Sequence, residues 1–121
     1  MRETRLWSLH LLAIPIIAVL LGSHFAIMHY APVFYGMSVE EARSFEVMIA
    51  RGKDTAQFVV YILLLAAGLY HGMYGLRGII RELPLTPSLG KAVDVVIVLF
   101  GLTIFALGFY VTWWTFSYNG V

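Results

Sequence analysis

The sequence predicts an all-α membrane protein with three transmembrane helices, and two observations lead to this prediction. First, 60% of its 121 residues are hydrophobic, 12% are charged, and the mean hydropathy is +0.83. A water-soluble domain of this size needs a more polar surface. Second, three stretches lack Asp, Glu, Lys and Arg: Leu6–Tyr30, Ala56–Leu76 and Val95–Val121. Each can cross a bilayer, because about 20 helical residues span the hydrocarbon layer.

We expect one domain, residues 1–121, with helices at about 6–30, 55–82 and 91–117. Helices are favoured because backbone groups in lipid must be paired within the segment. The first helix is too long for a signal-peptide core, and no small-residue cleavage site follows it, so we expect it to be retained. Pro15 lies inside this helix and should kink it or be tolerated through neighbouring contacts.

The connection between the first two helices carries its own helix signals. Ser38-Val39-Glu40-Glu41 has the form of a capping box, which predicts a short interfacial helix over Glu40–Ala50, ending near Gly52. Asp54 can then cap the second long helix. Between the second and third helices, the prolines of residues 83–88 predict a turn.

The distribution of basic residues predicts the orientation. Five basic residues lie before the first helix or between the second and third: Arg2, Arg5, Arg77, Arg81 and Lys91. Three lie between the first and second: Arg43, Arg51 and Lys53. The positive-inside rule therefore places the N-terminus and the 77–91 turn in the cytoplasm.

Composition excludes several kinds of site. The chain has no cysteine, which rules out disulfides, iron–sulfur ligation and covalent c-type haem attachment within it. A net charge of +1 is too small to indicate nucleic-acid binding.

Four histidines lie in the uncharged stretches: His10, His24, His29 and His71. Imidazole is costly in lipid without a partner, and it is a common ligand of haem iron. One such histidine is usually a hydrogen-bonded packing residue, but four in so small a domain are less easily explained in that way. A proton relay would normally include carboxylates inside the membrane. Here Glu82 and Asp94 lie near helix ends and outside the uncharged stretches, which disfavours a relay. We therefore favour haem binding.

Depth along the helices limits which histidines can share an iron. His71 lies roughly 9 Å from Arg77, and His24 roughly 28 Å from Arg5, both measured from the cytoplasmic side. Two axial nitrogens must lie ~4 Å apart. His24 and His71 therefore cannot ligate one haem together.

Two arrangements are left open. In the first, His24 and His71 each bind the iron of a separate haem, and another polypeptide supplies the second axial ligand. In the second, His10, roughly 8 Å from Arg5, pairs with His71 within the chain. We favour the first, because His10 lies beside Trp7 near the charged interface, where imidazole is stable without a ligand role. His24 and His29 are five residues apart and point in different directions, so one is the expected ligand. His24 is the deeper.

Glycines accompany the histidines. The second helix carries Gly68, Gly72, Gly75 and Gly78, and the third carries Gly101 and Gly108. Small residues at this spacing let helices, or a flat ring, approach the backbone closely. His71, Gly75 and Gly78 share one helix face.

The segment from Tyr70 to Arg77, with Glu82, resembles helix 2 of the cytochrome b membrane anchors of succinate dehydrogenase and fumarate reductase (complex II). In those anchors a haem-ligand histidine is followed by a glycine four residues later, an arginine, and an acidic residue eleven positions on. His71, Gly75, Arg77 and Glu82 occupy these places. The first helix is similar to helix 1 of di-haem anchors, where a histidine nine residues past a proline, here His24, is a ligand.

The resemblance implies site residues. His71 and His24 would ligate the iron of haem b, with His29, Gly75 and Arg77 also at the haem sites. Two haems are implied, each shared with a partner subunit. The quinone, a substrate, or a haem propionate would lie near Ser8, Arg77 and Glu82. Two departures stand out, since Leu83 and Leu12 occupy places where many single-haem anchors have Tyr and Arg.

The resemblance also implies a function. The chain would be a non-catalytic, multi-pass subunit of a succinate:quinone oxidoreductase of the tricarboxylic acid cycle, in the cytoplasmic membrane of a prokaryote. Its expected partners are a second anchor, an iron–sulfur subunit and an FAD flavoprotein, with electrons passing from the iron–sulfur subunit to quinone. The alternatives are a haem-free structural membrane subunit and a b-type cytochrome anchor of another quinone-linked oxidoreductase.

Overall fold

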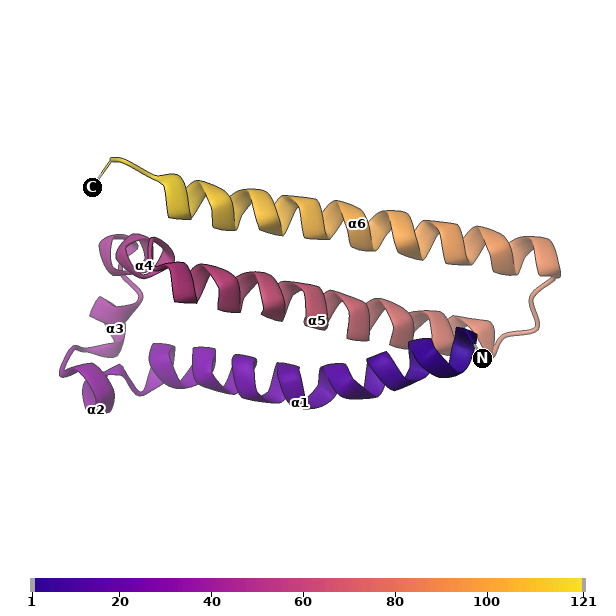
Figure 1. Ribbon diagram of the computed structural model, residues 1–121, viewed down its shortest axis with the longest axis horizontal. Helices are drawn as coiled ribbons and strands as arrows, with labels where there is room; N and C mark the ends of the chain where they lie inside the picture. Colours follow the sequence, from indigo (N-terminus) through magenta and orange to yellow (C-terminus); the bar gives the residue numbers. More distant parts are fainter. Residues whose placement is uncertain (1, 121) are drawn as a thin grey trace.

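The computed structural model describes residues 2–120 and consists there of helices and short connections. Three long helices, α1 (Arg2–His29), α5 (Thr55–Arg81) and α6 (Pro87–Ser117), lie side by side with α5 in the middle (Figure 1). Three short helices join α1 to α5: α2 (Ala31–Tyr35), α3 (Val39–Ala42) and α4 (Phe45–Gly52).

The three long helices are each long and apolar enough to cross a membrane, as the sequence predicted. Within residues 2–120, the buried hydrophobic side chains are few and mostly small: Ala13, Ala31, Ala42, Ile49 and Ile97. Large apolar side chains instead face outward along all three helices. Such a surface would be unfavourable in water and suits a lipid or protein environment. The length and the apolar surface of the three helices are therefore those of a multi-pass membrane protein.

Helix α5 packs against both α1 and α6, whereas the backbones of α1 and α6 do not approach each other within residues 2–120, so the bundle is a single layer of helices. Glycines of α6 allow the close approach to α5. A methyl group added at Gly108 would lie 2.7 Å from Cδ2 of Leu65, and one at Gly101 would lie 3.1 Å from Cγ of Met73. By contrast, the space around the glycines of α5 other than Gly75 is open.

The connection between α1 and α5 corrects one prediction and confirms two caps. Ser38 accepts a hydrogen bond from the Glu41 amide at 3.0 Å, and Asp54 caps α5 through the Gln57 amide. The single helix predicted over residues 40–50 is wrong, because it is divided into α3 and α4. Ser44 divides it: its hydroxyl caps α4 by accepting from the Val47 amide, which competes with helix continuation.

The ends of the long helices also differ from prediction. Helix α6 begins at Pro87 rather than near residue 91, because proline fits the first helical turn and Thr86 caps it through the Leu89 amide. Helix α1 begins at Arg2, and α2 was not predicted. The chain leaves α2 at Gly36, whose φ of 66° is left-handed. Pro15 is accommodated within α1, which curves along its length (Figure 1).

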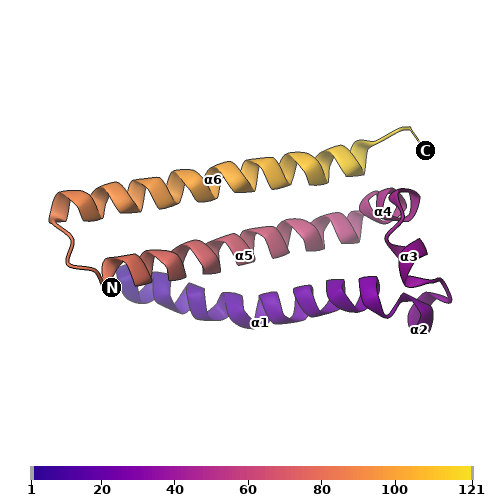
Figure 2. The same cartoon turned by 180° about the vertical axis from the view of Figure 1, so that it is seen from behind.

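The turn between α5 and α6 lies beside the N-terminal end of α1, and α2, α3 and α4 gather at the opposite end (Figure 2). We call these the Arg77 end and the Arg51 end. The side of the membrane that each end faces stays a prediction.

Candidate functional site

The histidines His10 of α1 and His71 of α5 lie face to face between their helices. Their ring centroids are 4.1 Å apart and their planes differ by 3°. Tyr74, one turn from His71 on α5, contacts the His10 ring at a centroid distance of 5.1 Å. Three rings from residues far apart in the sequence thus form one cluster inside the span.

One nitrogen of His71 has a defined role. Its Nδ1 lies 3.2 Å from the carbonyl oxygen of His10. A carbonyl oxygen only accepts, so Nδ1 must carry the proton and donate it. In neutral His71 the Nε2 is then the basic nitrogen, and it makes no hydrogen bond within residues 2–120. Metal-ligating histidines are typically oriented in this way, through the nitrogen that does not bind the metal.

The stacked arrangement does not suit an iron held by His10 and His71 together. Two axial imidazoles are arranged end to end, with nitrogens ~4 Å apart and ring centroids roughly 6 Å apart. Rings that stack at 4.1 Å leave no space between them for a porphyrin. Nδ1 of His10 is buried and has no hydrogen-bond partner in the described chain.

Gly75 was expected to allow a flat ring to approach α5. A methyl group added there would lie 3.5 Å from Cε1 of His10, an ordinary contact distance. The flat ring next to Gly75 within this chain is therefore the imidazole of His10. The glycine brings α1 close enough for the histidines to stack.

His24 occupies a separate place near the Arg51 end. Its ring meets Tyr61 of α5 edge-on at a centroid distance of 5.7 Å. Tyr61 precedes His71 by ten residues on the same helix, or about 15 Å along its axis. His24 and His71 are therefore at different heights and cannot share one iron within this chain.

His24 lines a cavity of about 510 Å³ between α1, α4, α5 and α6, which we call the His24 cavity. Its walls are mostly apolar or aromatic, and its polar side chains include Arg51 and Tyr61. Arg51 donates to Sδ of Met28 at 2.8 Å and to the carbonyl of Ala42. The cavity thus combines the imidazole of His24, the guanidinium of Arg51 and apolar walls. This combination is typical of a cofactor site.

His29 is placed differently. It is exposed at the last residue of α1 and stacks on Phe25 with centroids 4.2 Å apart. It does not line the His24 cavity. Of the two candidates on α1, His24 is thus the one that faces a cavity.

A charged cluster joins the three long helices at the Arg77 end. Arg77 donates to Asp94 of α6 at 2.8 Å and to Glu3 of α1 at 3.4 Å. Arg81 donates to the second carboxylate oxygen of Asp94 at 2.9 Å. Charges at the end of a membrane bundle are stabilised in this way by opposite charges.

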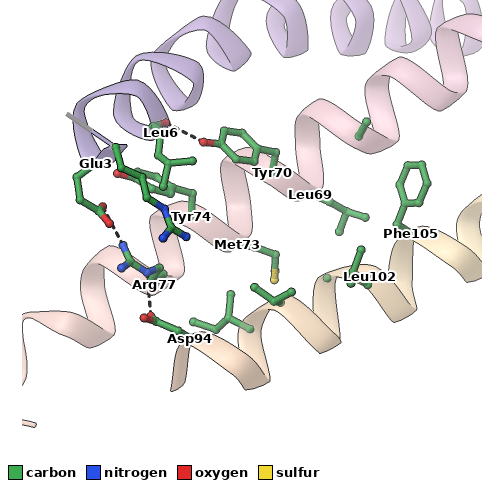
Figure 3. A pocket seen from close by; sticks show the side chains of 15 residues that line it. Glu3, Leu6, Leu69, Tyr70, Met73, Tyr74, Arg77, Asp94, Leu102 and Phe105 are labelled. Carbon is green, nitrogen blue, oxygen red and sulfur yellow. Dashed lines mark hydrogen bonds and ion pairs between the residues drawn. The ribbon is translucent and has the colours of Figure 1, made fainter. Parts of the chain in front are cut away.

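Glu3, Arg77 and Asp94 of this cluster also line one end of a second cavity, of about 480 Å³, which we call the Arg77 cavity. Figure 3 shows Glu3, Arg77 and Asp94 at one end of it, and Leu69, Leu102 and Phe105 toward the other. Tyr70, also in its lining, donates through its hydroxyl to the Leu6 carbonyl at 2.8 Å. The cavity therefore has a charged head and an apolar length, which fits an amphiphilic molecule.

Of the three residues predicted to lie near a quinone or propionate, Arg77 alone lines this cavity. Ser8 donates to the Thr4 carbonyl on its own helix, and Glu82 is an exposed residue at the end of α5. Sequence reasoning did not assign Glu3, Tyr70, Tyr74 or Asp94 to a site. The ion pair of Asp94 could have been predicted from the sequence, because a carboxylate at the end of a membrane span needs a cationic partner.

No group of three or more His, Cys, Asp or Glu side chains within residues 2–120 is arranged to hold a metal ion. A haem shared between two polypeptides would take one axial ligand from each, so a single histidine of this chain would be enough at each site. Nε2 of His71, which makes no hydrogen bond within residues 2–120, and the His24 ring beside its cavity could each supply one such ligand.

No protein-family model, curated protein or solved structure matches this chain.

Proposed function

We propose that this chain is a membrane anchor subunit of a succinate:quinone oxidoreductase, which binds haem b together with a partner anchor and helps to form the quinone site. Bis-histidine haem transfers single electrons and has no open coordination position, so it serves electron transfer rather than oxygen chemistry. The resemblance of the Tyr70–Arg77 segment to complex II anchors supports the choice of enzyme.

The observation that carries the haem assignment is the contact between His71 and the His10 carbonyl. A histidine inside a membrane span that donates through Nδ1 presents Nε2 as a ligand of fixed tautomer. The second ligand must come from elsewhere, because the His10 ring stacks on His71 instead of facing it end to end. This supports one haem shared with a partner subunit near the Arg77 end.

A second haem is proposed at His24. His24 lies at a different height in the bundle from His71, and it lines a cavity together with Arg51. These observations support a separate site at the Arg51 end. The described chain places no other histidine in this cavity, so the second axial ligand is again assigned to the partner.

The quinone is proposed to bind at the Arg77 cavity. The guanidinium of Arg77 and the hydroxyl of Tyr74 are potential donors to quinone oxygens, and the apolar walls suit an isoprenoid tail. The Arg77 end is assigned to the cytoplasm by the basic-residue count. The iron–sulfur and flavoprotein subunits would dock there, which keeps the electron path to quinone short.

The test is a reduced-minus-oxidised visible spectrum of the purified complex, isolated through a tag on this chain. We expect two b-type signals, with one lost in His71→Ala and the other in His24→Ala. Full haem content in both variants would refute the ligand assignment, and a wild-type complex without haem would support the haem-free structural alternative.

The remaining alternative is an anchor of another quinone-linked oxidoreductase. The same preparation separates it from the proposed enzyme. Succinate-dependent reduction of the haems and co-purification of a covalent or bound flavin subunit are expected of complex II. If succinate does not reduce the haems but another electron donor does, the chain belongs to another enzyme.

A further inference from the structure

Arg51 differs from the arginines at the other end of the bundle. Arg77 and Arg81 form ion pairs with carboxylates, whereas the described chain places no carboxylate within ion-pair distance of Arg51. Its guanidinium instead donates to a thioether sulfur, a weak acceptor, and to the carbonyl of Ala42. Arg51 is half-buried, and a partly desolvated cation without an anion is costly. A carboxylate from a bound molecule would offset that cost.

The position of Arg51 indicates which molecule. It lines the His24 cavity from α4, and its Nη1 contacts Sδ of Met28, which follows His24 by one helical turn on α1. One turn is about 5.4 Å along the axis. The carboxylates of haem are at the edge of the porphyrin, several ångströms from the iron. Arg51 lines the same cavity as His24 and contacts a residue one turn further along α1, so its guanidinium is placed to reach a carboxylate at the edge of a ring held by His24.

We propose that Arg51 binds a propionate carboxylate of the haem ligated by His24, and so positions that haem in the His24 cavity. This inference rests on the proposed function. The arginine fork matches a carboxylate in a bidentate manner, which also fixes the orientation of the ring. Its positive charge favours the reduced haem, because reduction adds negative charge next to it.

The test measures the midpoint potentials of both haems in the intact complex by spectroscopic redox titration. Arg51→Gln should shift the equilibrium of the His24 haem about tenfold toward the oxidised form, which is about 59 mV lower for a one-electron couple. The His71 haem, at a different height, serves as an internal reference and should keep its potential. Arg43→Gln is the matched control, because Arg43 lies in the same connection and donates to the Val39 carbonyl.

A second variant covers the case in which Arg51→Gln does not assemble. Arg51→Lys keeps the charge and removes the fork, so the propionate-bending bands in the resonance Raman spectrum of the His24 haem should shift. Unshifted bands in Arg51→Lys would overturn the inference.

The other outcomes are also decisive. If both haems are present and Arg51→Gln changes neither potential, the inference fails while the proposed function stands. Loss of a co-purified anionic lipid from that variant, with the potentials unchanged, would assign Arg51 to a lipid phosphate and also overturn it. A wild-type complex without haem would refute the proposed function itself, and this inference with it.

Discussion

The Nδ1 of His71 lies 3.2 Å from the carbonyl oxygen of His10, and the two imidazoles stack with their planes 3° apart. His10 thus supports His71 in two ways, through its backbone and through its ring. The backbone contact sets the tautomer, and it does not depend on the identity of residue 10.

This relationship predicts that His10 is not an iron ligand. His10→Ala and His10→Phe should both retain the two b-type haem signals, because the carbonyl that orients His71 is kept. Haem content of the purified complex, determined by pyridine haemochrome, checks this. If His10→Ala lost a haem as completely as His71→Ala does, His10 would itself be an axial ligand.

His24 and His29 should behave differently when replaced. His24→Ala is expected to remove one haem, because His24 lines the cavity, whereas His29→Ala should remove none, because its exposed ring contacts Phe25. The same haem determination, on complexes of matched subunit content, distinguishes them. The opposite pattern would move the ligand to the end of α1.

Asp94 should contribute measurably to the stability of the bundle. It accepts from Arg77 and Arg81, and it connects α6 to α5. Asp94→Asn should lower the free energy of unfolding by about 1 kcal/mol, since these side chains are partly exposed. Thermal unfolding of the detergent-solubilised chain measures it, and the difference should shrink in high salt.

The control for that variant is Glu40→Gln, which removes an exposed carboxylate on α3 that forms no ion pair in the described chain. An equal loss of stability in both variants would show that net charge matters, and not the contact with the arginines.

Gly108 should be sensitive to substitution and Gly78 should not. Gly108→Ala places a methyl group 2.7 Å from Leu65, so α5 and α6 must separate or repack, at about 1–3 kcal/mol. Gly78→Ala meets open space and should leave stability equal or slightly higher, since alanine favours helix. Thermal unfolding of the chain in one detergent compares them, and equal destabilisation would contradict the α5–α6 packing.

Parts of the site were accessible from sequence and parts were not. His24, His71 and Arg77 stood out because a polar side chain in an uncharged stretch is rare and costly. Arg51 was counted only for the orientation, since nothing in its neighbourhood along the chain shows that it reaches Met28, 23 residues away. Tyr70 and Tyr74 are ordinary span residues until the helix rotation is known.

The sequence alone determined the membrane character, the three long helices and the caps at Ser38 and Asp54, because hydropathy, length and capping depend on neighbouring residues. The tertiary structure decided that His10 stacks on His71, that Arg51 shares a cavity with His24, and that Asp94 pairs with Arg77. These contacts join residues on different helices. They depend on how each helix is rotated and shifted against its neighbour, which the local pattern of residues does not specify.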